Sequence, residues 1–120
     1  MLIEPTERKF IMIIAVDFDG TLCEECYPNI GKPNVRLIND LVHRRSMGDK
    51  VILWTCREES LLEDALKWCG QWGLEFDAVN DNLEEIKNFY NHNSRKITAD
   101  YYIDDKAVKA NEAYIHRLSF

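Results

Sequence analysis

The chain has 120 residues, of which 46% are hydrophobic and 30% are charged, as expected for a single globular domain that spans residues 1–120. The net charge of −6 disfavours nucleic acid and anionic membranes as partners, because both select a basic surface. The longest apolar run, Phe10–Val16, is shorter than the ~20 residues that a membrane-spanning helix needs, and no signal-peptide cleavage site accompanies it. We therefore expect a cytoplasmic protein whose thiols are reduced.

The first part of the chain begins with a strand and continues through a loop and a helix. The continuous apolar run Phe10–Val16 is typical of a strand buried on both faces. Residues 23–34 are polar and contain two prolines and a glycine, which predicts a loop. Residues 35–47 have apolar side chains at helical spacing and are followed by Gly48, which predicts a helix that ends there.

The rest of the chain repeats the alternation of strand and helix. We expect strands at 51–55, 76–79 and 100–105, and helices at 58–72, 83–91 and 107–118. Strands that alternate with helices in this way form parallel sheets with helices on both faces. The sequence therefore predicts an α/β fold, a single-domain, Rossmann-like three-layer α/β/α arrangement with a mainly parallel sheet.

Polar side chains gather after the predicted strands, where ligands bind in such sheets. These side chains are Asp17, Asp19, Thr55, Asn80, Asp81, Asp104 and Asp105. Two strands that end on acidic pairs would bring like charges together unless a cation joined them, and carboxylate oxygens are ligands that Mg²⁺ prefers. Single polar residues at strand ends are usually caps or turn residues, and we expect this role for Asp77, Asn80, Asp81 and Asp100.

The segment "DFDGTL", Asp17–Leu22, resembles the first motif of the haloacid dehalogenase (HAD) superfamily, whose phosphatases and phosphotransferases carry Asp-x-Asp-Gly-Thr/Val after an apolar strand. The order of the later motifs is similar: Thr55 ends "ILWT", Lys96 lies in "SRKITADYYIDD", and that segment ends on Asp104 and Asp105. The similarity covers nearly the whole chain and is greatest to small hydrolases of the superfamily that have almost no cap. It implies a HAD-like fold with no cap domain. The resulting open site would serve a large substrate or borrow a lid from another subunit in a homo-oligomer.

By this resemblance, the first motif supplies the nucleophile and the general acid. Asp17 would attack phosphorus to form an aspartyl-phosphate and would also bind Mg²⁺. Asp19 would protonate the leaving oxygen and then activate water, and its backbone carbonyl would be a second metal ligand. Gly20 and Thr21 would bind the phosphate, since glycine lets backbone amides approach it closely.

The later motifs would supply the remaining parts that phosphoryl transfer needs, which are charge neutralisation and positioning. The resemblance implies that Thr55 hydrogen-bonds the phosphoryl oxygens and that Lys96 neutralises the charge of Asp17 and of the phosphate. Asp104 would complete the metal site, with Asp105 as a ligand or a neighbour of the ligands.

The basic residues leave alternatives open. Lys87 or Arg95 would take the neutralising role if Lys96 lies too close to the last strand in the sequence to reach the phosphate. Arg57, which follows the predicted second strand, is a candidate for binding a second anionic group of the substrate. Its alternative is a surface position at the start of a helix.

Cys23 and Cys26 have the spacing of zinc ligands. A zinc site needs further ligands, however, and the chain has no second pair with this spacing and only scattered histidines. We expect both cysteines to line the entrance of the site without taking part in chemistry.

The sequence thus predicts a Mg²⁺-dependent phosphatase that acts on a phosphorylated substrate of unknown identity. Two alternatives stay open, a signalling switch that carries a phosphorylated aspartate and a non-catalytic module that binds metal or phosphate for a partner. The motif order disfavours the switch, because receivers of that type carry the acceptor aspartate on a middle strand. Metal-dependent turnover distinguishes the enzyme from the binding module.

Overall fold

The computed structural model describes residues 11–106 of the chain. Its central feature is a four-stranded sheet in the order β5-β4-β1-β6, in which all neighbouring strands are parallel. The strands are β1 (Ile13–Val16), β4 (Lys50–Leu53), β5 (Ala78–Val79) and β6 (Tyr101–Ile103). The predicted α/β fold with a parallel sheet is confirmed, and the helix predicted at 107–118 lies outside the described residues.

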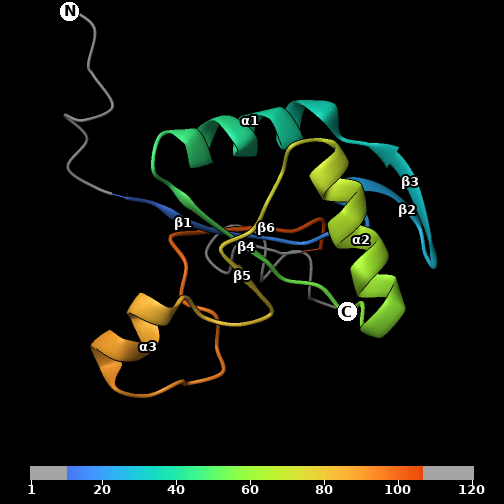
Figure 1. Ribbon diagram of the computed structural model, residues 1–120. Helices are drawn as coiled ribbons and strands as arrows, with labels where there is room; N and C mark the ends of the chain where they lie inside the picture. Colours follow the sequence, from blue (N-terminus) through green and yellow to red (C-terminus); the bar gives the residue numbers. More distant parts are fainter. Residues whose placement is uncertain (1–10, 107–120) are drawn as a thin grey trace, which may run out of the picture.

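Helices cover both faces of this sheet (Figure 1). Successive side chains of a strand point to opposite faces, and the core is divided accordingly. On one face, Ile14 and Val16 pack in a buried cluster with residues of α1 (Val35–Ser46) and α2 (Glu59–Gln71). On the other face, Ala15 packs with residues of α3 (Glu84–Tyr90) and its flanks. β1 is apolar throughout because both of its faces are covered.

The two longer helices begin and end within one residue of their predicted bounds. α1 follows Asn34, whose side-chain oxygen accepts a hydrogen bond from the N–H of Leu37 at 3.3 Å and so caps the helix. α2 presents Ala65 and Cys69 to the core, in agreement with the apolar stripe that predicted it. No helix within residues 11–106 has both the length and the apolar character needed to cross a membrane.

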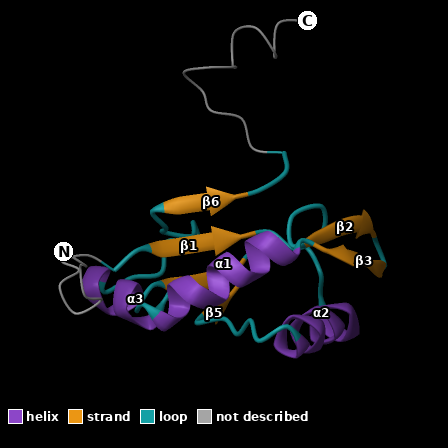
Figure 2. Ribbon diagram, turned by 90° about the horizontal axis from the view of Figure 1, so that it is seen from above, coloured by secondary structure: helices purple, strands orange, loops and turns teal. Residues whose placement is uncertain are grey.

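The segment 23–34, which we predicted to be a loop, forms a β-hairpin of β2 (Cys23–Cys26) and β3 (Asn29–Pro33). The prediction was wrong because the two short strands form a separate two-stranded sheet, and prolines are compatible with the edge positions of such a sheet. Gly31 allows the close pairing, since a Cβ there would lie 2.4 Å from the backbone oxygen of Glu24. The hairpin lies beyond the carboxyl ends of β1 and β6 (Figure 2), and within residues 11–106 no cap domain is inserted.

Candidate active site

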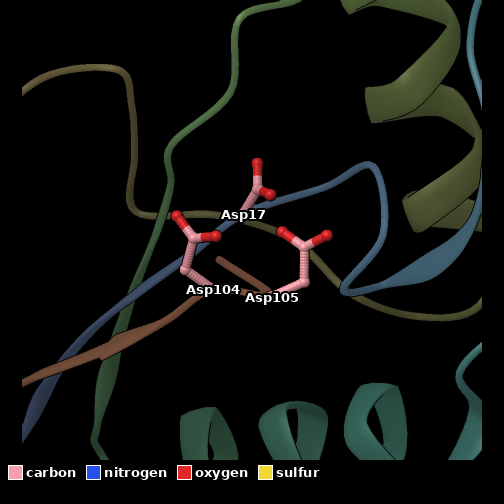
Figure 3. A group of neighbouring side chains, drawn as sticks. All are labelled: Asp17, Asp104 and Asp105. Carbon is pink, nitrogen blue, oxygen red and sulfur yellow. The ribbon is translucent and has the colours of Figure 1, made fainter. Parts of the chain in front are cut away.

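Three aspartates meet where β1 and β6 end. The two strands are parallel neighbours in which Val16 lies opposite Ile103, so Asp17 and Asp104 emerge together at the next position. One carboxylate oxygen from each of Asp17, Asp104 and Asp105 lies within 4.8 Å of the others. Figure 3 shows the three carboxylates on the same side of the strand ends, around a shared space. We call these three residues the acidic cluster, and the sequence assigned all of them to a metal site.

The acidic cluster is electrostatically unbalanced. Burial is the largest effect on the pKa of the Asp17 carboxyl and raises it above the ordinary value, while a hydrogen bond from the N–H of Phe18 opposes this rise. The negative charges of Asp104, Asp105 and Asp19 raise it further. Among the described residues, no basic side chain forms an ion pair with a member of the cluster. Repelling carboxylates fit a cation, and their hard oxygen atoms suit Mg²⁺.

Gly20 makes room for the acidic cluster. Its φ angle of +82° lies in the left-handed region, and a Cβ at this position would lie 2.4 Å from Oδ2 of Asp105. Thr21, which was predicted to bind phosphate together with Gly20, is buried, and its backbone oxygen accepts a hydrogen bond from Nδ2 of Asn34 at 3.1 Å. The contacts of these two residues therefore serve the position of Asp105 and the local chain, and neither residue lines the cavity beside the cluster.

The acidic cluster forms part of the wall of a cavity of about 360 Å³. Three other predicted site residues, Asp19, Thr55 and Arg57, also line this cavity. The backbone N–H of Thr55 donates to Oδ1 of Asn80 at 2.7 Å, which ties the end of β4 to the end of β5. The hydroxyl oxygen of Thr55 accepts a hydrogen bond from the N–H of Arg57 at 3.1 Å, and a hydroxyl that accepts in this way can still donate its proton to a ligand oxygen.

Asp19 pairs with an arginine and does not join the acidic cluster. Nε of Arg57 donates to one carboxylate oxygen of Asp19 at 2.9 Å, and Nη2 donates to the other at 2.7 Å. The predicted metal role of Asp19 was through its backbone carbonyl, and this side-chain pairing leaves that role as a prediction. Arg57 is only 1% exposed, so the alternative of a surface position for this residue was wrong.

The lysine that was predicted to neutralise the phosphate does not line the cavity. Lys96 is exposed, and its backbone oxygen accepts a hydrogen bond from Nδ2 of Asn82 at 3.0 Å. Of the two alternatives, Lys87 forms an ion pair with Asp81 at 3.1 Å, and Arg95 is exposed and also absent from the cavity wall. The described structure therefore brings none of these three basic groups into the cavity.

Three residues that line the cavity were not predicted as site residues: Glu25, Cys56 and Lys106. Glu25 comes from the hairpin, which was predicted to be a loop, and Tyr27 of the same hairpin also lines the cavity. Lys106 could have been found, because it directly follows the acidic pair after β6. Cys23 and Cys26, which we expected at the entrance of the site, do not line this cavity.

Comparisons with known proteins support the fold and name no activity. The chain matches no protein-family profile and no curated protein. A solved structure, described as that of a conserved protein from Bacteroides thetaiotaomicron, is similar with a TM-score of 0.73 and 41% sequence identity. The similarity covers 82% of this chain and 79% of that one. With this identity and coverage, the chain belongs to the same family as that conserved protein from Bacteroides thetaiotaomicron.

Proposed function

We propose that this protein is a Mg²⁺-dependent phosphatase of the HAD type, which hydrolyses phosphoric monoesters through an aspartyl-phosphate on Asp17. The acidic cluster carries the proposal, because it places the carboxylate of Asp17 beside two others, and among the described residues no basic side chain forms an ion pair with any of the three. The same cavity also contains a second aspartate, Asp19, and the hydroxyl of Thr55. The HAD motif order assigns these residues to phosphoryl transfer.

The acidic cluster supplies the residues that would hold the metal ion, namely Asp17, Asp104 and Asp105. When bound, Mg²⁺ supplies positive charge close to the nucleophile, which offsets the repulsion between Asp17 and the phosphate oxygens. The raised pKa of Asp17 agrees with this need, because burial and the neighbouring negative charges make its ionised form less favourable than that of an isolated aspartate.

Two aspartates carry out the bond changes. Asp19 starts the cycle with a proton on a lone pair that Arg57 does not use. In the first step, a carboxylate oxygen of Asp17 attacks phosphorus, the bond from phosphorus to the ester oxygen breaks, and that oxygen takes the proton of Asp19. In the second step, Asp19 takes a proton from water, the water oxygen bonds to phosphorus, and the bond from phosphorus to Asp17 breaks, which releases inorganic phosphate and restores both aspartates. The hydroxyl of Thr55 donates a hydrogen bond to a phosphoryl oxygen in both steps.

A basic group must balance the remaining charge, and we assign this role to Lys106. It lines the cavity that contains Asp17, whereas Lys96 does not. With Mg²⁺ bound, the five acidic residues of the cavity wall, which carry −5 when all are ionised, are nearly balanced by the ion, Lys106 and Arg57, which together carry +4. The residual charge of −1 disfavours a polyphosphate, which adds more negative charge than a substrate with a single phosphoryl group.

The proposal is tested with p-nitrophenyl phosphate as the substrate. We expect hydrolysis in the presence of Mg²⁺, none in the presence of EDTA, and a loss of at least ~10³-fold in Asp17→Asn, because that variant lacks the nucleophile. The control is Asp64→Asn, which changes an exposed aspartate of α2 and should retain full activity. Activity that survives in Asp17→Asn would overturn the assignment. Mg²⁺ binding without any turnover would instead favour the non-catalytic binding module.

A further inference from the structure

Arg57 is the most extensively bonded buried side chain next to the cavity. Its guanidinium lies 5.0 Å from the centre of the Phe18 ring and 5.2 Å from that of the Tyr27 ring. Together with the two hydrogen bonds to Asp19, these contacts join the segment after β1 to the hairpin. A buried arginine retains its charge, and its carboxylate partner offsets the cost of that burial.

The same guanidinium holds the turn of the hairpin. Nη1 of Arg57 donates to the backbone oxygen of Pro28 at 3.1 Å, and Nη2 donates to that of Asn29 at 3.0 Å. With the pair to Asp19, these four hydrogen bonds use most of the donors of the guanidinium. A guanidinium occupied in this way has little capacity left for a second substrate anion.

The hairpin in turn supplies part of the cavity wall. Glu25 and Tyr27 belong to it and line the cavity that contains Asp17 and Asp19. The hairpin, held by Arg57, therefore forms one wall of the space in which the phosphoryl group would react. Loss of the hydrogen bonds of Arg57 would therefore free the hairpin from the cavity wall and free the Asp19 side chain at the same time.

We propose that Arg57 is a positioning residue that fixes the carboxylate of Asp19 in the cavity and makes its position depend on the seated hairpin. This inference rests on the proposed function in one respect, since it assumes that Asp19 transfers the proton. The bidentate pair leaves further lone pairs of the Asp19 carboxylate for the substrate or for water. The position of the Asp19 carboxylate and the place of the hairpin in the cavity wall thus depend on the same guanidinium.

The first test compares two arginines that make the same kind of pair. Nε and Nη2 of Arg45 donate to the two carboxylate oxygens of Asp77 at 3.2 and 2.9 Å, outside the cavity. Lysine keeps the charge in Arg57→Lys and Arg45→Lys but cannot span both oxygens. We expect kcat for p-nitrophenyl phosphate to fall by ~10- to 100-fold in Arg57→Lys at a nearly unchanged KM, and to stay at the wild-type value in Arg45→Lys. A raised KM with unchanged kcat in Arg57→Lys would mean that Arg57 grips the substrate, and would overturn the proposal.

The second test needs no turnover, so it separates this proposal from the proposed function. Hydrogen exchange of the backbone amides in residues 23–33 should become ~10-fold faster in Arg57→Lys than in the wild type, and should not change in Arg45→Lys. Unchanged exchange in Arg57→Lys would overturn the link to the hairpin even if the wild-type protein is an active phosphatase. Faster exchange in a wild-type background without phosphatase activity would support the link and overturn only the catalytic role of Asp19.

A second variant keeps the test decisive if Arg57→Lys fails to fold. Asp19→Asn retains the volume of the side chain but presents an N–H₂ group to the guanidinium donors. We expect faster amide exchange in residues 23–33 of this variant as well. Without the two hydrogen bonds to Asp19, the guanidinium of Arg57 is held less firmly, and so is the hairpin that it binds. Wild-type exchange rates there would show that the hairpin is held without the Asp19–Arg57 pair, and would overturn the proposal.

Discussion

Aspartates lie at both ends of the parallel sheet, and the two groups have different partners. At the amino end, Asp49, Asp77 and Asp100 accept hydrogen bonds from the backbone N–H groups of residues 12, 51 and 13, at 3.0, 2.8 and 2.7 Å. At the carboxyl end, the members of the acidic cluster face one another. The same type of side chain thus completes the hydrogen bonding of strand starts at one end and forms a candidate cation site at the other.

The pKa shifts follow the same division. Burial would raise the pKa of Asp77, but the hydrogen bonds from Arg45 and from the N–H of Val51 outweigh it and lower the pKa. Burial raises the pKa of Asp17, and the neighbouring negative charges add to the rise. The ionised form of Asp77 therefore stabilises the fold, whereas ionisation of Asp17 costs stability.

The largest expected effect comes from crowding the acidic cluster through Gly20. A Cβ in Gly20→Ala would meet the carboxylate of Asp105, and we expect phosphatase activity to fall by ~100-fold with weaker Mg²⁺ binding in calorimetry. Gly48→Ala is the matched control at the amino end of the sheet, because Gly48 has a φ of +102° and no atom within 4 Å of its Cβ position. It should lose about 1 kcal/mol of stability and no activity. Full activity in Gly20→Ala would show that the position of Asp105 is not needed.

The next effect separates two lysines. We expect Lys106→Met to lower kcat/KM for p-nitrophenyl phosphate by ~10- to 100-fold, because it removes the lysine of the cavity wall. Lys96→Met should change it by less than ~2-fold, since Lys96 is exposed and does not line the cavity. The reverse result would restore to Lys96 the neutralising role that the motif order predicts for it.

The two ends of the sheet also differ in how far the sequence predicts them. The apolar runs predict the strands, and the parallel sheet then brings Asp17 and Asp104 together, because register is a consequence of the fold. The pairing of Asp19 with Arg57 could not be predicted in this way, since it joins residues 38 positions apart through the path of two loops. The hairpin escaped prediction because its strands have no alternating apolar pattern. Whether Lys96 or Lys106 lines the cavity depends on the path of the chain before β6, and no local sequence pattern predicts that path.

A smaller effect is expected at the amino end of the sheet. Asp77→Asn should lower the free energy of unfolding by about 2 kcal/mol at pH 7, because Asp77 accepts charge-assisted hydrogen bonds from Arg45 and its side chain is only 16% exposed. Since the folded state lowers the pKa of Asp77, this stabilisation is complete above the unfolded value of about 3.9 and disappears as the pH falls through the folded value.

Urea denaturation at several pH values checks this prediction. The difference between the wild type and Asp77→Asn should shrink below about pH 4, and phosphatase activity at pH 7 should be unchanged. The control is Asp40→Asn, which breaks an exposed pair with Arg44 and should cost less than about 0.5 kcal/mol. A difference that stays constant down to low pH would mean that the charge of Asp77 is not what stabilises the fold.

The smallest expected effect has the opposite sign and depends on the cation. Without metal, Asp17→Asn should be more stable than the wild type by up to about 1 kcal/mol, because it removes one of the repelling charges of the acidic cluster. This difference should disappear as the pH falls, since the raised folded pKa means that protonation of Asp17 relieves the cost. Saturating Mg²⁺ should reverse the order, because binding stabilises only the protein that retains the site. Urea denaturation in EDTA and in Mg²⁺ measures the sign of the difference in free energy of unfolding between the wild type and Asp17→Asn under each condition. A wild type that is more stable than Asp17→Asn in EDTA would mean that these carboxylates are satisfied by the protein itself, and the contrast between the two ends of the sheet would fail.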